Sequence, residues 1–183
     1  MLNIPNLITI LRVLLIPVIV YFLIERSYGA ALITFLVSAL SDLLDGFIAR
    51  RFNQMSAFGA ILDPIADKLT MLAVTMVLAA ENLLPVWLAV AIVARDVVIV
   101  SGAVAYRALT GHLEMVPTLL SKLNTLLEFG LVMLVLVDAS ALANLSAPLR
   151  SLFILVFVTV SVSGLHYVWV WSWKAARETR RTK

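Results

Sequence analysis

The chain has 183 residues, of which 62% are hydrophobic and only 14% are charged, and its formal net charge is +3. Soluble domains carry more charge and fewer apolar residues, so this composition excludes an ordinary water-soluble enzyme and indicates a membrane protein. The absence of cysteine also excludes disulfides, thiolate metal sites and a cysteine nucleophile.

Six long apolar segments follow one another along the chain, with short polar breaks between them. A membrane-spanning helix needs about 20 mostly apolar residues, whereas the strands of a membrane barrel show short alternating segments. We therefore expect an all-α fold, an integral membrane bundle of six transmembrane helices formed by residues 1–174, followed by a basic tail at 175–183. The expected spans are 7–24, 29–49, 60–80, 84–109, 118–137 and 148–173.

The basic residues that flank these segments are distributed unevenly. Only Arg26 and Arg150 mark one side of the expected bundle. Arg12 lies about a turn inside the first span, and its side chain is expected to extend to the lipid headgroups. The positive-inside rule then places both termini in the cytoplasm, most naturally at a bacterial inner membrane, and nothing suggests a nucleic-acid partner. The basic residues on the cytoplasmic side are Arg50, Arg51, Arg107, Lys174, Arg177, Arg180, Arg181 and Lys183.

Four aspartates interrupt the apolar pattern where the second expected helix gives way to the third. Asp42 and Asp45 are three positions apart and Asp63 and Asp67 are four apart, so each pair lies on one face of its helix. An aspartate at the centre of a span costs about 2.5–3.5 kcal/mol on insertion scales, so the cluster needs a compensating cation. Carboxylates without nearby histidine or thiol favour Mg²⁺ or Mn²⁺.

Three further residues surround the aspartates. Gly46 and Gly59 permit the close approach of a ligand or helix, and the guanidinium of Arg50 is suited to a phosphate group. Together these residues match the pattern D-x2-D-G-x2-A-R-x8-G-x3-D-x3-D, which resembles the signature of the CDP-alcohol phosphatidyltransferase family. The matching residues are Asp42, Asp45, Gly46, Ala49, Arg50, Gly59, Asp63 and Asp67.

This resemblance implies an enzyme that moves the phosphatidyl group of CDP-diacylglycerol onto an alcohol and releases CMP. By the same resemblance, Asp42, Asp45 and Asp63 hold one or two Mg²⁺ or Mn²⁺ ions. Asp67 is then a shared metal ligand or the general base that deprotonates the acceptor. The family also implies a homodimer within the membrane lipids. The residues expected at the CDP-lipid are Asp42, Gly46, Arg50 and Gly59.

The acceptor is expected to bind to positively charged side chains near the cytoplasmic ends of later spans. Arg95 and Arg107 are twelve positions apart, close to a shared helix face, although Arg95 has Asp96 as an alternative partner. The candidate acceptor-binding residues are Arg95, Arg107, Lys122 and Asn124.

Within the family, the R-D-V opening, this arginine spacing and the run P-T-x2-S-K-x-N-T resemble CMP-forming cardiolipin synthases, whose acceptor is phosphatidylglycerol. The opening NIPNLITILR also resembles phosphatidylglycerophosphate synthases, which accept glycerol 3-phosphate, so that enzyme is the alternative.

Other classes of membrane protein also place acidic residues inside spans. A transporter is the remote alternative, but its two halves usually carry corresponding sites, and this sequence has a single acidic cluster. A membrane prenyltransferase would ordinarily show two aspartate-rich motifs and release pyrophosphate. A purely structural lipid-binding protein would not need Asp63 and Asp67.

Overall fold

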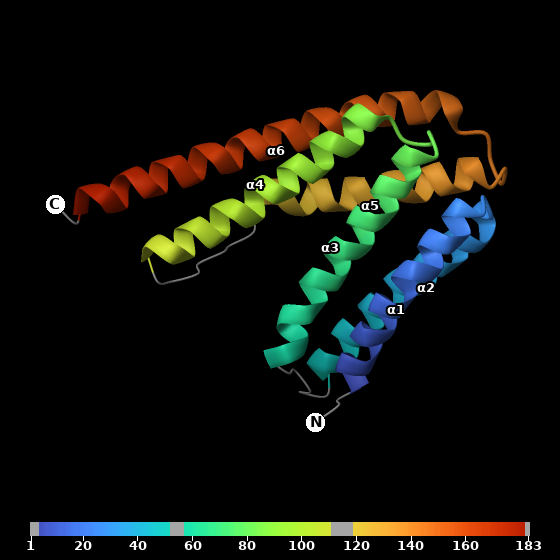
Figure 1. Cartoon of the computed structure of the whole chain (residues 1–183), viewed down its shortest axis with the longest axis horizontal. Coiled ribbons are helices and arrows are strands. Elements are labelled where there is room, and N and C mark those ends of the chain that lie inside the picture. Colours follow the sequence, from blue (N-terminus) through green and yellow to red (C-terminus); the bar gives the residue numbers. More distant parts are fainter. Residues whose placement is uncertain (1–3, 52–56, 111–118, 182–183) are drawn as a thin grey trace. The chain divides into compact units, whose positions relative to one another are not determined.

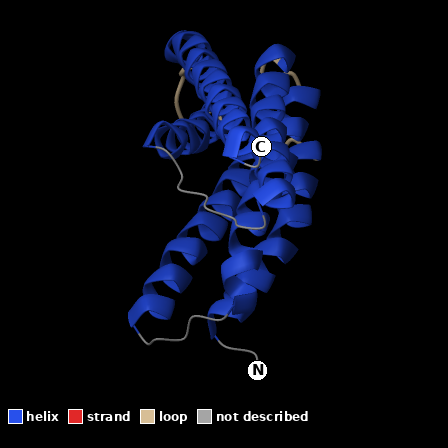
Figure 2. Ribbon diagram, turned by 90° about the vertical axis from the view of Figure 1, so that its left-hand side faces the viewer, coloured by secondary structure: helices blue, strands red, loops and turns tan. Residues whose placement is uncertain are grey.

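The computed structural model describes the backbone of residues 4–51, 57–110 and 119–181, and the side chains of residues 10–41, 65–102, 104 and 121–170. Within these ranges the chain is all-α, with six helices and no strand, which confirms the expected fold class (Figures 1 and 2). The helices are α1 (Ile4–Ile24), α2 (Tyr28–Arg51), α3 (Ala57–Ala80), α4 (Val86–Thr110), α5 (Leu119–Ala139) and α6 (Ser146–Arg181).

The helices divide between two compact units. The first unit contains Met1–Leu84 and Val132–Ser146, and therefore holds α1, α2, α3 and the end of α5. The second contains Pro85–Leu131 and Ala147–Lys183, and therefore holds α4, the beginning of α5 and α6. Each unit has its own buried apolar residues, so the two are described separately.

In the first unit, α1 packs against both α2 and α3 (Figure 1). One ion pair, Arg12 with Asp67, joins α1 to α3, and a second, Arg26 with Glu81, joins the turns that directly follow these helices; each links residues 55 positions apart. A constant offset means that α1 and α3 run in the same direction without slipping in register.

Apolar residues occupy the same seam between the two ion pairs. Ile19 and Leu23 of α1 are fully buried, and the residues at the same offset in α3, Val74 and Leu78, are fully buried as well. The spacing of these positions along α1 is close to the seven-residue repeat of packed helices. Arg12 and Asp67 therefore occupy a position of the seam that an apolar pair would ordinarily fill.

Helices α1 and α3 end in the same hydrogen-bonded motif. After α1, Arg26 adopts a left-handed backbone with φ of 56°, and the N–H groups of Arg26 and Ser27 donate to the carbonyls of Leu23 and Phe22. After α3, Asn82 has φ of 60°, and the N–H groups of Asn82 and Leu83 donate in the same pattern to Ala79 and Leu78. These bonds satisfy the last carbonyls of each helix and stop it sharply.

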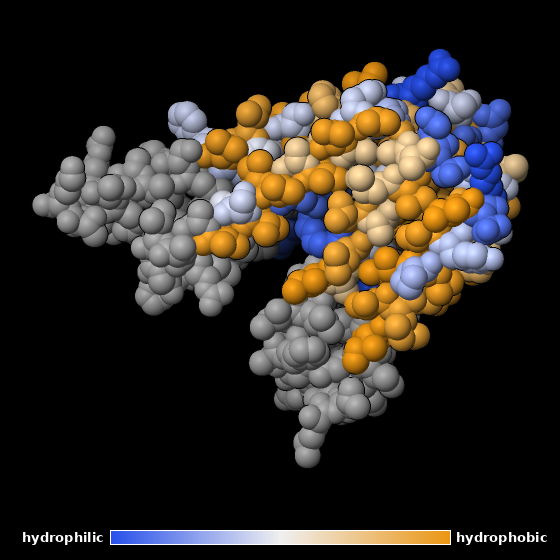
Figure 3. All heavy atoms as spheres, viewed as in Figure 1, coloured by the Kyte–Doolittle hydropathy of each residue, from blue (hydrophilic) through white to orange (hydrophobic). Residues whose placement is uncertain are grey.

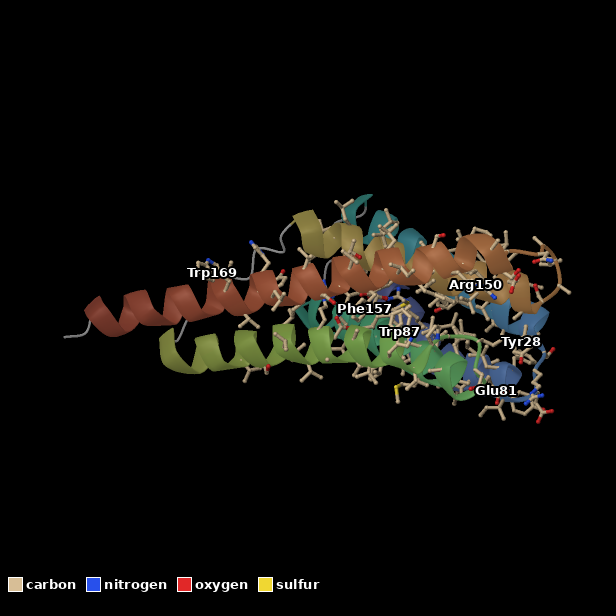
Figure 4. All side chains as sticks on the ribbon, turned by 90° about the horizontal axis from the view of Figure 1, so that it is seen from above. Tyr28, Glu81, Trp87, Arg150, Phe157 and Trp169 are labelled. Atoms are coloured by element: carbon tan, nitrogen blue, oxygen red, sulfur yellow. The ribbon has the colours of Figure 1, made fainter. Side chains whose placement is uncertain are left out.

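In the second unit, α4 and α6 share an aromatic contact. The rings of Trp87 and Phe157 meet edge to face with centroids 5.1 Å apart, and they lie together in Figure 4. Leu88, which follows Trp87, and Val156, which precedes Phe157, are fully buried. Edge-to-face pairs add to the stabilisation that burial of the ring surface already provides.

Apolar side chains also cover much of the described surface (Figure 3). Among the described residues, one stretch, Ser146–Val170 of α6, is both long and apolar enough to cross a bilayer, and the described parts of α1 and α2, Ile10–Ile24 and Tyr28–Ser41, are apolar as well. This comparison covers only the residues whose side chains the structure describes, which are parts of α1 to α5. The expectation of six spans therefore stays a prediction.

Candidate active site

The aspartate signature lies at the end of α2 and the beginning of α3. Asp42 and Asp45 belong to the last turns of α2, and Asp63 and Asp67 belong to the first turns of α3. The segment 52–56, which joins the two helices, lies outside the described residues. Chain connectivity therefore brings both aspartate pairs to one end of the first unit, the end at which α1 begins.

The two aspartate pairs also lie at matching depths. Asp45 is six residues before the end of α2 at Arg51, and Asp63 is six residues after the start of α3 at Ala57, or about 9 Å along each axis. Asp42 lies about 14 Å from the end of α2, and Asp67 lies about 15 Å from the start of α3. Because each pair has one member at each depth, the backbone permits four carboxylates to serve one site.

Asp67 is the member of this cluster whose side chain the structure describes. Its Oδ1 accepts a hydrogen bond of 2.8 Å from Nη1 of Arg12, in α1. The Arg12 side chain is only 2% exposed, whereas the Asp67 side chain is 50% exposed. The expectation that Arg12 extends to the lipid headgroups is wrong, because a carboxylate 55 positions away in the sequence holds its guanidinium inside the protein.

The remaining residues of the expected CDP-lipid and metal sites lie outside the described side chains. These residues are Asp42, Asp45, Gly46, Arg50, Gly59 and Asp63. Among the side chains that are described, no group of three or more histidine, aspartate or glutamate residues is arranged to hold a metal ion. The donor chemistry of the signature, carboxylate oxygen throughout, fits a hard divalent cation.

Arg95, expected at the acceptor, lies buried among three helices of the second unit. Its Nη1 donates to Oδ1 of Asp96 at 2.8 Å, and its Nη2 donates to Oγ of Ser121 in α5 at 2.9 Å. The same Nη2 is 3.5 Å from Oγ of Ser163 in α6. The stem of Arg95 packs beside Gly164 of α6, where a Cβ would lie 3.8 Å from its Cγ, an ordinary van der Waals distance. Arg95 therefore connects α4, α5 and α6.

The other expected acceptor residues are not gathered around Arg95 by any described contact. Lys122 is exposed, and the side chain of Arg107 lies outside the described residues. Asn124 is fully buried and its Nδ2 donates to Oε1 of Glu128 at 2.6 Å, while its Oδ1 is buried without a hydrogen bond. Ser121, Asn124 and Glu128 recur at helical spacing and so share a face of α5.

Comparison with known proteins supports the resemblance seen in the signature. The family model for CDP-alcohol phosphatidyltransferase matches residues 2–163. A Homo sapiens protein named cardiolipin synthase (CMP-forming) is 38% identical over 148 residues, covering 71% of this chain and 48% of that protein. A Schizosaccharomyces pombe fusion protein of cardiolipin synthase (CMP-forming) and a mitochondrial hydrolase is 35% identical over 180 residues, covering 90% of this chain and 30% of that protein.

A second kind of relative matches over a shorter stretch. The CDP-diacylglycerol–glycerol-3-phosphate 3-phosphatidyltransferase of Pseudomonas fluorescens is 48% identical over 103 residues, covering 53% of this chain and 52% of that protein. This chain therefore spans about half, or less, of the length of the relatives described here. The family match itself extends over most of the chain and includes all eight residues of the signature. The chain belongs to the CDP-alcohol phosphatidyltransferase family.

Proposed function

We propose that this protein transfers the phosphatidyl group of CDP-diacylglycerol to phosphatidylglycerol, giving cardiolipin and CMP. The observation that carries the proposal is the complete aspartate signature inside a family match that covers residues 2–163. The structure adds that this signature lies at one end of a packed helical unit, with its aspartates at two matching depths. A donor set of that kind is suited to a diphosphate substrate.

The choice of acceptor rests on how far each kind of relative matches. Proteins named cardiolipin synthase align with 71% and 90% of this chain, whereas the glycerol-3-phosphate enzyme of Pseudomonas fluorescens aligns with 53%. The longer matches favour phosphatidylglycerol as the acceptor. The higher identity of the shorter match, 48%, keeps phosphatidylglycerophosphate synthase as the alternative.

Each part of the signature has a role in this proposal. Asp42, Asp45 and Asp63 hold one or two divalent cations, Mg²⁺ or Mn²⁺, with Asp67 as a shared ligand or the general base. A bound cation would offset the negative charge of the diphosphate and of the departing CMP. The nucleotide side of the CDP-lipid is contacted by Asp42, Gly46, Arg50 and Gly59.

The transfer itself needs one proton acceptor and one leaving group. The acceptor hydroxyl oxygen forms a bond to the phosphorus that carries the diacylglycerol, and the bond from that phosphorus to the oxygen shared with CMP breaks. The hydroxyl proton passes to the carboxylate of Asp67, and CMP leaves with the bonding electrons. Half of the Asp67 side chain is exposed, which is compatible with this role.

We place the protein in a membrane, with the six helices as six spans and both termini in the cytoplasm. The long apolar helix α6 and the apolar surface support this placement. The anionic acceptor is held by Arg95, Arg107, Lys122 and Asn124, the protein acts as a homodimer among membrane lipids, and the basic tail at 175–183 faces the cytoplasm.

The proposal is tested with purified protein in detergent, Mg²⁺, labelled CDP-diacylglycerol and either phosphatidylglycerol or glycerol 3-phosphate. Formation of CMP and cardiolipin from phosphatidylglycerol is the expected result. Phosphatidylglycerophosphate formed only from glycerol 3-phosphate would replace the first proposal by the alternative. A control with EDTA in excess over Mg²⁺ is expected to stop CMP release, since the carboxylates alone cannot neutralise the diphosphate.

A further inference from the structure

Arg12 of α1 contacts a residue of the aspartate signature from a different helix. Its Nη1 donates to Oδ1 of Asp67 at 2.8 Å, and its side chain is 2% exposed. We propose that Arg12 is a positioning residue, which fixes the orientation of the Asp67 carboxylate while leaving part of that carboxylate accessible to substrate. This inference rests on the proposed function of Asp67 as a shared ligand or base.

Burial distinguishes this contact from a surface ion pair. A guanidinium that is removed from solvent needs a specific partner, because an uncompensated charge inside a protein or membrane is strongly unfavourable. Asp67 supplies that partner from the neighbouring helix, yet its own side chain stays 50% exposed. The arrangement is therefore asymmetric: the Arg12 side chain is enclosed, whereas half of the Asp67 side chain is exposed.

The packing of α1 against α3 does not by itself explain a buried arginine. Arg26 and Glu81 already join the turns that follow these two helices at the same offset, with Arg26 74% exposed. Between the two ion pairs, the seam contains fully buried apolar residues, including Ile19 and Val74. An apolar pair at the position of Arg12 would fit this seam, and replacement of buried ion pairs by packed apolar residues is often neutral or stabilising.

Control of a carboxylate's orientation is what a guanidinium does well. A charge-assisted hydrogen bond to one oxygen restricts rotation of the carboxylate about its side-chain bonds. Misplacement of a reacting group by as little as 1 Å can reduce a rate by about a hundredfold. Arg12 therefore contributes to the rate of transfer rather than to the affinity for the CDP-lipid.

The kinetic test compares Arg12→Gln with Arg12→Lys and with Arg26→Gln, which removes the exposed pair in the turns that follow the same helices. For Arg12→Gln we expect kcat to fall by about tenfold to a hundredfold, with KM for CDP-diacylglycerol within about twofold of wild type. Arg12→Lys restores the charge without the planar guanidinium, so its kcat should lie between those of Arg12→Gln and wild type. Arg26→Gln should leave kcat and KM unchanged.

A second readout does not depend on turnover. Thermal unfolding in detergent is measured for wild type, Arg12→Gln, Asp67→Asn and the double variant, without added Mg²⁺ or lipid. If Arg12 acts through Asp67, Arg12→Gln lowers Tm less in the Asp67→Asn background than in wild type, because its charged partner is already gone. Where Arg12→Gln does not yield folded protein, Arg12→Lys is used in the same cycle.

Two results would overturn the inference. One is a wild-type kcat for Arg12→Gln, and the other is an equal loss of Tm in both backgrounds, which would make Arg12 independent of Asp67. Failure of the proposed function looks different: wild type itself would release no CMP with either acceptor. In that case the thermal cycle still decides whether Arg12 and Asp67 act together.

Discussion

Arg12, Arg26 and Arg95 carry the same guanidinium group in three different surroundings. Arg12 and Arg95 are almost fully buried and each donates to an aspartate oxygen at 2.8 Å, whereas the side chain of Arg26 is 74% exposed. An exposed ion pair contributes about 0–1 kcal/mol to stability, because solvent screens it. The two buried arginines are therefore the ones whose replacement we expect to affect the molecule.

Arg95 is expected to stabilise the second unit through its bonds to three helices. The substitution Arg95→Met removes the hydrogen-bond donors to Asp96, Ser121 and Ser163 and breaks the ion pair with the partly buried Asp96. We expect the free energy of unfolding to fall by roughly 2–4 kcal/mol, measured by chemical denaturation in detergent.

The matched control for this prediction is Arg150→Met, at an exposed position near the start of α6. The same change there should alter the free energy of unfolding by no more than about 0.5 kcal/mol. Equal effects of the two substitutions would show that the hydrogen bonds of Arg95 do not stabilise the fold.

Residue spacing explains which of these features the sequence predicts. The aspartate signature is recognisable because its residues are close together, and the family match confirms that interpretation. The partner of Arg12 lies 55 positions away, and no local pattern indicates that α1 and α3 are packed in parallel at this offset. The neighbouring aspartate of Arg95 was expected as its alternative partner, but the serines from α5 and α6 were not.

At the scale of the helices, local composition determines most of the boundaries. The six helices lie within a few residues of the expected segments, because short polar turns such as the one at Glu81 and Asn82 interrupt each apolar run. The largest difference is α6, which continues to Arg181 instead of ending at 173. Its last turns contain alanine, arginine, lysine and glutamate, which favour helix regardless of hydropathy.

The end of α5 offers a direct test of helix termination. Ala141 has φ of 59°, a left-handed conformation that a Cβ makes unfavourable by about 1–2 kcal/mol, and its N–H donates to the carbonyl of Asp138. In Ala141→Gly this strain is lost, so we expect the free energy of unfolding to rise by roughly 0.5–1 kcal/mol. Denaturant titration of the purified protein measures the difference.

The same substitution inside a helix should have the opposite sign. Ala91→Gly, within the second turn of α4, is expected to lower the free energy of unfolding by about 1 kcal/mol, because glycine loses more backbone entropy than alanine. A decrease for Ala141→Gly of similar size would mean that Ala141 does not adopt the left-handed conformation in solution.

At the scale of the whole molecule, the number of membrane spans is the property that most needs a direct measurement. The chain is 62% hydrophobic, which is hard to reconcile with a single membrane helix. Yet among the described residues only Ser146–Val170 is long and apolar enough by itself to cross a bilayer. The described side chains cover only part of α1 to α5, whereas Ser146–Val170 is described throughout.

Cysteine labelling separates the two topologies, and the chain has no native cysteine to interfere. Ser27→Cys, Ser56→Cys and Ser140→Cys are each introduced singly and treated with a membrane-impermeant maleimide in intact cells and in inverted vesicles. With six spans and both termini in the cytoplasm, Ser27 and Ser140, in the turns after α1 and α5, lie on the external side of the membrane. Ser56, between α2 and α3, then lies on the cytoplasmic side. If α6 alone crossed the membrane, all three cysteines would react from the same side, and the aspartate signature would then lie at a membrane surface rather than within a bundle.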